Sequence, residues 1–449
     1  MGERMIKLKE LTEDTIQEFK KCYFSDEKKI NLTKLFMTES ISDVAFDATR
    51  ANQHKFEFSI DIPTMNAVSQ GAAGRCWITA GLNLLREIAA RKMCKHGKEA
   101  VELEFSLAYI AFWDKMEKAN CFLEKIIQNM DKSYDDKHVR SWFSCGITDG
   151  GFWTNFSDLV KKYGLLPKEV MPETAQSSNT EVMNNRLNYY IRKIGADIRN
   201  AYLQKQSFDE INHMKEQALN HIFSFLCECY SCPVEEFEYQ YIDSNGRSKT
   251  SKYTPHSFRD ELIDGYLDVL TPVISLPYEH LPYGEYCEIK DIYKVINMHN
   301  EIFLNLSMDV MKNLCIEQLK NGVPIVCVAD DDKMLSDELQ LWDDSSFDYK
   351  NTIGFTFDMS RKDYFQLKAG NASHSMLITG VNINKEGLPD RWKIENSYDI
   401  EGLHKGYFSC SDTWFEKYMV SVVIENQYLQ EYKKAENDKL NTLDLADIL

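Results

Sequence analysis

The feature that most constrains the fold of this chain is a change of pattern near residue 270. Before it, apolar residues recur at three- and four-residue steps, which indicates helices over 76–95, 103–130, 155–164 and 180–232. After it, short apolar runs indicate strands at 269–276, 302–306, 325–328, 376–381, 392–395 and 418–424. A helix-rich first part followed by a sheet-rich second part predicts an α+β fold.

Size and composition exclude several classes of protein. The 449 residues are about three times the usual single-domain length, and 43% of them are hydrophobic, which excludes a disordered chain. The formal net charge of −18 argues against nucleic acid as a partner. No apolar run reaches the roughly 18 residues that span a bilayer, and the N-terminus lacks a secretory signal core. We therefore expect no membrane partner and a cytoplasmic location, where the twelve cysteines stay reduced.

A glycine-rich loop leads into the first long predicted helix. Residues 70–77 read Gln-Gly-Ala-Ala-Gly-Arg-Cys-Trp, and the glycines permit a sharp turn just before Cys76 opens the helix. A thiol at a helix N-terminus meets the positive end of the helix dipole, which favours the thiolate, and Arg75 adds a nearby cation. The amide of Gln70 and the Cys76 N–H can face a developing oxyanion. This pattern predicts a nucleophile, the usual alternative being a buried helix cysteine.

Two later segments carry the partners that a nucleophilic cysteine needs. His374 opens an apolar run that ends in a glycine turn, so its ring can face a cleft from a strand edge. Asn396 ends another short strand, and an Asn oxygen can accept a hydrogen bond from an imidazole N–H and fix its tautomer. The two lie 22 residues apart, enough for one β-hairpin to bring them together. The sequence therefore predicts a triad of Cys76, His374 and Asn396.

In this order and these contexts, the three segments resemble the papain-like cysteine peptidases. The resemblance is closer to one branch, that of bleomycin hydrolase and bacterial aminopeptidase C, which has a large insertion between its Cys and His. Cys76 and His374 lie 298 positions apart. Further similar stretches lie at 149–153, 160–167, 170–173 and 404–407, so the similarity runs from residue 10 to residue 427.

The resemblance implies a two-lobed papain-like fold, with a helical lobe, a β-barrel-like lobe, a large helical insertion and a C-terminal tail. It divides the chain into an N-terminal lead-in (1–60), a helical catalytic lobe (61–175), a helical insertion or oligomerisation arm (176–265), a β-rich catalytic lobe (266–427) and the tail (428–449). The first catalytic lobe carries Cys76, and the second carries His374 and Asn396.

The resemblance also implies an activity and an assembly. We expect an intracellular cysteine aminopeptidase that removes N-terminal residues from peptides through an acyl-enzyme intermediate, without cofactor or metal. Family members form a hexamer, so the expected partners are peptide substrates and further copies of the chain. Within this reaction Cys76 would be the nucleophile, His374 the acid and base, Asn396 the orienting residue and Gln70 the oxyanion donor.

Substrate binding is implied at two places. Asp149, Gly150 and Gly151 belong to a segment that matches the family, so the resemblance implies that they bind substrate, and the terminal carboxylate of Leu449 would pair with the ammonium of the substrate. The chain departs from the family at its end, however, because residues 442–449 read Thr-Leu-Asp-Leu-Ala-Asp-Ile-Leu. Two alternatives therefore stay open: an endopeptidase or acyl-transfer enzyme with the same triad, and a non-catalytic assembly protein.

The chain also departs from the family beside the triad. Tyr398 stands where the family usually has a Trp that shields the Asn–His hydrogen bond, Asp399 replaces a Gly, and Ser375 replaces an Ala. These changes predict a working triad with altered properties.

Two further clusters suggest metal sites, and we assign both to structure. Cys227, Cys229 and Cys232, with His221 nearby, lack a second pair at zinc-finger spacing, which favours a helix end in the core. Residues 330–332 are three aspartates without the Gly and Glu of an EF-hand loop, which favours a solvated turn after a strand.

Overall fold

The computed structural model describes residues 8–93, 103–242, 246–290, 292–432 and 440–443. The chain divides into two compact units. The first comprises residues 1–55 and 343–359, and the second comprises residues 56–342 and 360–449. All predicted site residues belong to the second unit, and among them Leu449 lies outside the described residues.

The first unit is built from short capped helices. They are α1 (Glu13–Phe24), α2 (Glu27–Leu35), α3 (Ile41–Ala45), α4 (Ala48–Ala51), the 3-10 turn η2 (Asp344–Ser346) and α14 (Tyr349–Ile353). Asp47 caps α4 and donates its backbone N–H to the Ser346 carbonyl at 2.8 Å. The Asp348 N–H donates to the Ala45 carbonyl, also at 2.8 Å. Backbone hydrogen bonds therefore join residues 343–359 to the N-terminal segment.

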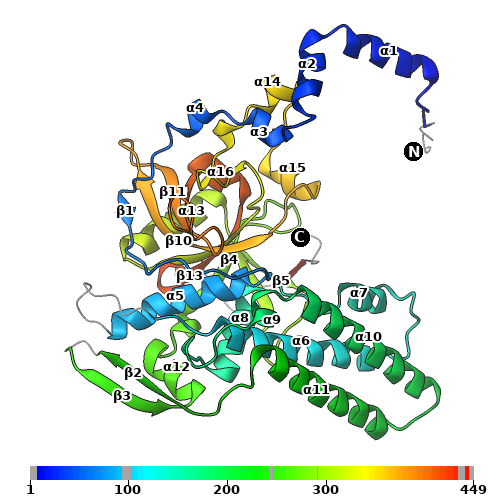
Figure 1. The fold of residues 1–449 in the computed structure, drawn as a ribbon, viewed down its shortest axis with the longest axis vertical. Coiled ribbons are helices and arrows are strands. Elements are labelled where there is room, and N and C mark those ends of the chain that lie inside the picture. Colours follow the sequence, from blue (N-terminus) through cyan, green and yellow to red (C-terminus); the bar gives the residue numbers. More distant parts are fainter. Residues whose placement is uncertain (1–7, 94–102, 243–245, 291, 433–439, 444–449) are drawn as a thin grey trace. The chain divides into compact units, whose positions relative to one another are not determined.

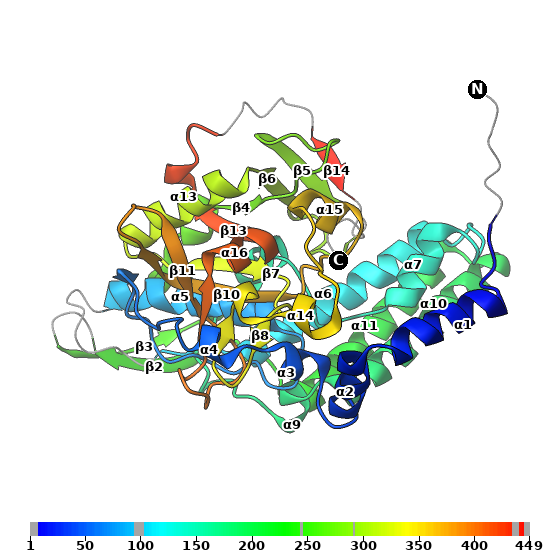
Figure 2. The same cartoon turned by 90° about the horizontal axis from the view of Figure 1, so that it is seen from above.

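The helices of the second unit account for most of its first half. They are α5 (Cys76–Met93), α6 (Leu107–Gln128), α7 (Lys137–Cys145), α8 (Trp153–Tyr163), α9 (Ala175–Ser178), α10 (Glu181–Leu203), α11 (Phe208–Tyr230), α12 (Pro255–Ile263), α13 (Met308–Lys320), α15 (Arg361–Gln366) and α16 (Asp412–Tyr418), with 3-10 turns η1 (Tyr266–Val269) and η3 (Asn426–Tyr428). Helices α6, α10 and α11 pack side by side, as Figures 1 and 2 both show. Within the described residues, no helix is long and apolar enough to cross a membrane.

One large mixed sheet forms the second half of this unit. Its strands are β4 (Leu270–Ile274), β5 (Glu285–Ile289), β6 (Glu301–Asn305), β7 (Ile325–Ala329), β8 (Leu335–Ser336), β9 (Leu341–Trp342), β10 (His374–Ile383), β11 (Pro389–Glu395), β12 (Tyr407–Ser411), β13 (Met419–Glu425) and β14 (Asn441–Leu443). Their order is β14-β5-β6-β4-β13-β7-β10-β11-β12-β9-β8, and β1 (Ile60–Asp61) pairs with β10 outside this path. A separate hairpin joins β2 (Phe237–Ile242) and β3 (Ser248–Tyr253).

The central strands β7, β10 and β13 are buried along most of their length because both faces of the sheet are covered. Val326, Leu377 and Val423 pack on Ala80 and Leu84 of α5, which lies along the sheet (Figure 1). Their sequence neighbours point to the opposite face, as strand geometry requires, and belong to a second cluster that includes residues of α13. The contact between α5 and the sheet therefore fixes the helix that begins at Cys76 against the strand that begins at His374.

The predicted α+β fold is confirmed, with specific differences in its elements. The six predicted strands correspond to β4, β6, β7, β10, β11 and β13. The helix predicted over 155–164 is α8, which begins at Trp153 and ends at Tyr163; the next residue, Gly164, caps it with a φ of 81°, in the left-handed region that glycine adopts most easily. The block predicted as helical over 180–232 is two helices, α10 and α11, capped separately. The β2–β3 hairpin was not predicted.

Candidate active site

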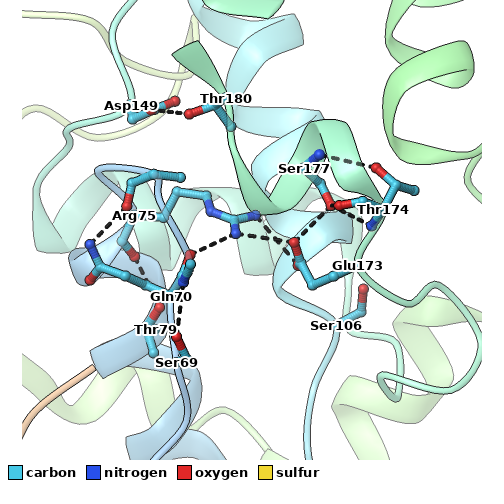
Figure 3. A network of polar contacts seen from close by, with 12 residues as sticks. Ser69, Gln70, Arg75, Thr79, Ser106, Asp149, Glu173, Thr174, Ser177 and Thr180 are labelled. Atoms are coloured by element: carbon cyan, nitrogen blue, oxygen red, sulfur yellow. Dashed lines mark hydrogen bonds and ion pairs between the residues drawn. The ribbon is translucent and has the colours of Figure 1, made fainter. Parts of the chain in front are cut away.

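The loop before Cys76 is held in place by the buried side chain of Arg75. The guanidinium donates to the Gln70 carbonyl at 2.8 Å and forms an ion pair with Glu173 at 3.1 Å (Figure 3). Glu173 also accepts a hydrogen bond from the Ser177 hydroxyl at 2.7 Å. The expectation that Arg75 supplies a cation to the thiol is therefore corrected, because its charge is paired with Glu173 and ties the loop to the segment before α9.

The turn at the start of this loop requires glycine. Gly71 has a φ of +72°, and a Cβ atom placed there would lie 2.6 Å from the Ser178 carbonyl oxygen. The next residue, Ala72, donates its N–H to the same oxygen at 2.8 Å. This close backbone approach sets the direction in which the chain enters α5, and it leaves Cys76 half-buried at the helix N-terminus.

His374 and Asn396 form the pair that the sequence predicts. His374 Nε2 lies 2.7 Å from Asn396 Oδ1, which also accepts the Ser397 N–H at 2.7 Å. Both side chains are buried, with His374 7% and Asn396 1% exposed. Because Nε2 faces Asn396, Nδ1 is the ring nitrogen left to face Cys76.

The environment of His374 favours its protonated form. Burial alone would lower the pKa of His374, but the hydrogen bond and the charge of Cys76 outweigh burial. Asp331 and the hydrogen bond to Asn396 act in the same direction, and the pKa rises from 6.5 to about 9. The structure therefore brings Cys76, His374 and Asn396 together as one interacting group.

The strands and helix that carry these side chains are locked together by a buried ion pair. Glu395, the last residue of β11, accepts from Arg86 of α5 at 2.7 Å and from Asn83 of the same helix at 2.8 Å. Burial raises the pKa of Glu395 to about 7, against the opposing effect of Arg86. Since Asn396 follows Glu395 directly, this pair fixes its position relative to the helix of Cys76.

Gln70 lies beside both Cys76 and the Asn396 segment. Its Nε2 donates to the Ala73 carbonyl at 2.7 Å, and its Oε1 accepts from the Ser397 hydroxyl at 2.5 Å. An amide NH₂ has two hydrogens, so one remains for a ligand after the bond to Ala73. Gln70 also lines the cavity that Cys76 and His374 border, which is where an oxyanion donor must lie.

Cys76 and His374 open into a cavity of about 610 Å³. Gly150 and Gly151 line it, and so does Ser375. Most of the remaining lining is aromatic or aliphatic: Trp77, Trp142, Phe152, Trp153, Ile274, Ile292, Phe303, Val326, Val328 and Val422. A cavity of this size and lining suits an apolar side chain held by few polar groups.

The predicted substrate-binding residue Asp149 uses its carboxylate within the protein. It forms an ion pair with Lys115 at 2.5 Å and accepts from Thr180 at 2.6 Å, Asn184 at 2.9 Å and the Gly74 N–H at 3.3 Å. These charged and polar partners hold the pKa of Asp149 below its usual range, although burial opposes them. Asp149 therefore connects the Cys76 loop to α6 and α10.

Lys118, a second lysine of α6, holds the loop at residues 148–150 in place. Lys118 donates to Asp114 at 2.8 Å, to the Thr148 carbonyl at 3.0 Å and to the Gly150 carbonyl at 2.6 Å. All three ammonium hydrogens are thereby used. Burial lowers the pKa of Lys118, and Asp114 opposes that effect.

Both clusters considered as metal sites take part in the fold. Among the residues that the structure describes, no group of three or more His, Cys, Asp or Glu side chains could hold a metal ion. The turn predicted at residues 330–332 follows β7, but Asp330 is only 1% exposed and accepts from Tyr364 and from the Asn371 N–H. The prediction that this turn is solvated is therefore wrong for Asp330. Cys229 is buried at the end of α11, whereas Cys232 is exposed.

Several residues that shape the site were not predicted. Glu173, Lys115 and Lys118 hold the two loops, and Asp331 faces His374. In the sequence they are ordinary charged residues. The spacing of Asp114 and Lys118 at i and i+4 inside an apolar helix was the one available signal of a buried pair.

Comparisons with known proteins agree with this geometry. A model of the Peptidase C1-like family matches residues 10–448. Aminopeptidase C of Lactobacillus delbrueckii subsp. lactis is 31% identical over 97% of each chain, and aminopeptidase C of Listeria monocytogenes is 28% identical over 94% of each chain. The crystal structure of pepw from Lactobacillus rhamnosis HN001 superposes with a TM-score of 0.92 and 29% identity, covering 98% of both chains. The chain therefore belongs to the Peptidase C1-like family, which confirms the predicted papain-like class of cysteine-type peptidase.

Proposed function

We propose that this protein is a cysteine aminopeptidase that removes N-terminal residues from peptides through Cys76, His374 and Asn396. The observation that carries the proposal is the position of His374 between two partners, with Asn396 Oδ1 at 2.7 Å from Nε2 and Cys76 acting on the ring from the other side. The similarity to aminopeptidase C over nearly the whole chain supports removal of N-terminal residues.

In the first half of the reaction, Cys76 Sγ attacks the carbonyl carbon of the scissile peptide bond. The N–H of Cys76 has no partner within the first turn of α5, and together with the free hydrogen of Gln70 it would donate to the oxyanion. His374 gives its proton to the leaving amine as the C–N bond breaks. A thioester between Cys76 and the substrate acyl group remains.

In the second half, His374 is the base that takes a proton from water. The hydroxide attacks the thioester carbonyl, the oxyanion forms at the same donors, and the C–S bond breaks to release the free acid. Asn396 keeps the imidazole in one orientation throughout, because its Oδ1 accepts from Nε2 in both protonation states.

The cavity points to the kind of side chain that the enzyme takes. Its aromatic and aliphatic lining favours peptides with a large apolar residue next to the scissile bond. We also propose a homo-hexamer, a cytoplasmic location and the five-part division of the chain described above, all supported by the family resemblance.

The test of the chemistry is Cys76→Ala, assayed by release of a dye from an amino-acid anilide. We expect loss of at least about 1,000-fold in kcat, because Cys76 is the thiol that acts on His374 and the variant lacks the sulfur that would form the acyl-enzyme. Cys145→Ala is the matched control, since Cys145 is exposed in the same cavity and does not act on His374. Residual activity in Cys76→Ala equal to that of the unaltered protein would remove the proposal.

A second assay separates aminopeptidase from endopeptidase or acyl-transfer activity. The same peptide is offered with a free and with an acetylated N-terminus, to the full chain and to a chain shortened at its C-terminus. Cleavage of the free form alone supports an aminopeptidase, and equal cleavage of both forms supports an endopeptidase. A protein whose Cys76 reacts with no thiol-directed epoxide would instead be a non-catalytic assembly protein.

A further inference from the structure

The turn after β7 places a carboxylate beside the predicted base. β7 and β10 are antiparallel neighbours, with Ala329 opposite His374, so residues 330–332 lie next to the start of β10. Asp331 is fixed there by Ser373, whose hydroxyl donates to Asp331 Oδ1 at 2.8 Å and accepts the Asp331 N–H at 3.2 Å. Trp342 Nε1 donates to the Asp331 carbonyl at 2.7 Å. Three hydrogen bonds to Ser373 and Trp342 therefore hold Asp331 in place.

Tyr398 connects Asp331 to the His374–Asn396 pair. Its hydroxyl donates to Asp331 Oδ2 at 3.2 Å. Its ring centroid lies 5.2 Å from that of His374 at an angle of 45°, and Phe408 packs on its other edge at 5.7 Å. Tyr398 thus packs its ring against the imidazole while its hydroxyl holds a carboxylate.

The charged groups around His374 come from several elements. The groups that raise its pKa are Cys76 at the start of α5, Asp331 after β7 and Asn396 after β11. Asp337 also acts on the Tyr398 hydroxyl. Of these, Asp331 is the carboxylate whose charge helps to raise the pKa of His374.

We propose that Asp331 and Tyr398 are positioning residues for the His374 imidazolium: Tyr398 packs against the ring and holds Asp331 where its negative charge stabilises the protonated form. This inference rests on the proposed role of His374. A buried imidazolium is costly unless an anion lies nearby. The Cys76 thiolate supplies one before the reaction, but it loses its charge when its sulfur bonds to the carbonyl carbon, while His374 still holds its proton. The Asp331 carboxylate takes no part in making or breaking bonds, so it stabilises His374 when the sulfur no longer does.

The test is Asp331→Asn, which keeps the shape and one of the two side-chain oxygens that accept hydrogen bonds but removes the charge. The rate of Cys76 alkylation by iodoacetamide is measured against pH by peptide mass spectrometry, next to the pH profile of kcat/KM for a free-amine anilide. The upper step of both profiles reports loss of the His374 proton. We expect this step to move to lower pH by about 0.5 unit, as for a carboxylate acting through a high effective dielectric, with KM unchanged.

Asp332→Asn is the matched control, because Asp332 is the exposed neighbour that pairs with Lys333, and its upper step should stay in place. Tyr398→Phe keeps the ring and removes the hydroxyl, so we expect a smaller shift in the same direction. An unchanged upper step in Asp331→Asn, or an equal shift in Asp332→Asn, overturns the inference. If Asp331→Asn does not fold, an unchanged step in Tyr398→Phe overturns it.

The alkylation profile of the unaltered protein distinguishes failure of the proposed function from failure of the inference about Asp331 and Tyr398 alone. If Cys76 shows no preferential labelling and no upper step, the proposed function fails. If Cys76 is labelled and the upper step is present but insensitive to Asp331 and Tyr398, the proposed function stands and this inference alone fails.

Discussion

The free energy of unfolding should depend on pH through one buried carboxyl, Glu301. This residue opens β6 and is 2% exposed. Its Oε2 accepts the Thr154 N–H at 3.0 Å, and its Oε1 has no hydrogen-bond partner in the described structure. Burial is the main reason why the pKa of Glu301 rises from 4.5 to about 8; Thr154 opposes the rise and the nearby Asp158 adds to it.

The direction of this pH dependence follows from which state, folded or unfolded, binds the Glu301 proton more tightly. Between pH 4.5 and 8 the folded protein keeps Glu301 protonated, whereas the unfolded chain ionises it. Raising the pH through this window therefore favours the unfolded chain. Each pH unit costs about 1.4 kcal/mol for a single proton, so the contribution of Glu301 should fall by about 2.7 kcal/mol from pH 5.5 to pH 7.5.

Glu301→Gln isolates this contribution because glutamine stays neutral at every pH. Urea denaturation is followed by tryptophan fluorescence at several pH values for both proteins. We expect the difference in unfolding free energy between the unaltered protein and Glu301→Gln to change by about 2.7 kcal/mol over that window. The exposed Glu386→Gln serves as control and should show no such change. A difference that is constant with pH for Glu301→Gln would refute the reasoning.

Two further substitutions test the loops that frame the cavity. Glu173→Gln should destabilise the protein by about 3 kcal/mol and lower kcat, because it leaves the buried Arg75 guanidinium without its counter-charge. Thermal unfolding measures the loss of stability, and the anilide assay measures kcat. An unchanged melting temperature would contradict this role of Glu173. Gly151→Ala should cost about 1–3 kcal/mol, because the new Cβ would lie 2.6 Å from the ring of Trp77. Gly150→Ala, whose Cβ would meet no atom within 4 Å, should keep its melting temperature, and equal losses in the two variants would exclude the steric explanation.

The parts of the fold that could be predicted are those with a local signal. The strands β7, β10 and β13 each contain a short run of mainly apolar residues, and α5 has a regular apolar spacing after a glycine loop. The alternation of buried and exposed residues along β2 is also local, but this segment was included in a helical insertion, so its hairpin was missed.

The candidate site likewise contains residues that could be predicted from a local sequence signal and residues that could not. Cys76, His374 and Asn396 each stand in a recognisable local context, and the structure brings them together. The partners of the surrounding charges could not be predicted, because a carboxylate such as Glu173 has the same appearance in a sequence whether it is solvated or paired. Asp330 shows the difficulty: it belongs to a run of three aspartates that is typical of an exposed turn, yet it is buried against Tyr364.

The ion pair between Arg86 and Glu395 has a consequence for redesign of this enzyme. It joins the helix behind the thiol to the strand that precedes Asn396, so the reacting groups and the central scaffold share the same contacts. Substitutions at Arg86 or Glu395 that aim to alter substrate preference would therefore destabilise the fold. Gly150 borders the cavity of Cys76 and His374, and a Cβ placed there would meet no atom within 4 Å, so this position offers the more permissive starting point for directed evolution.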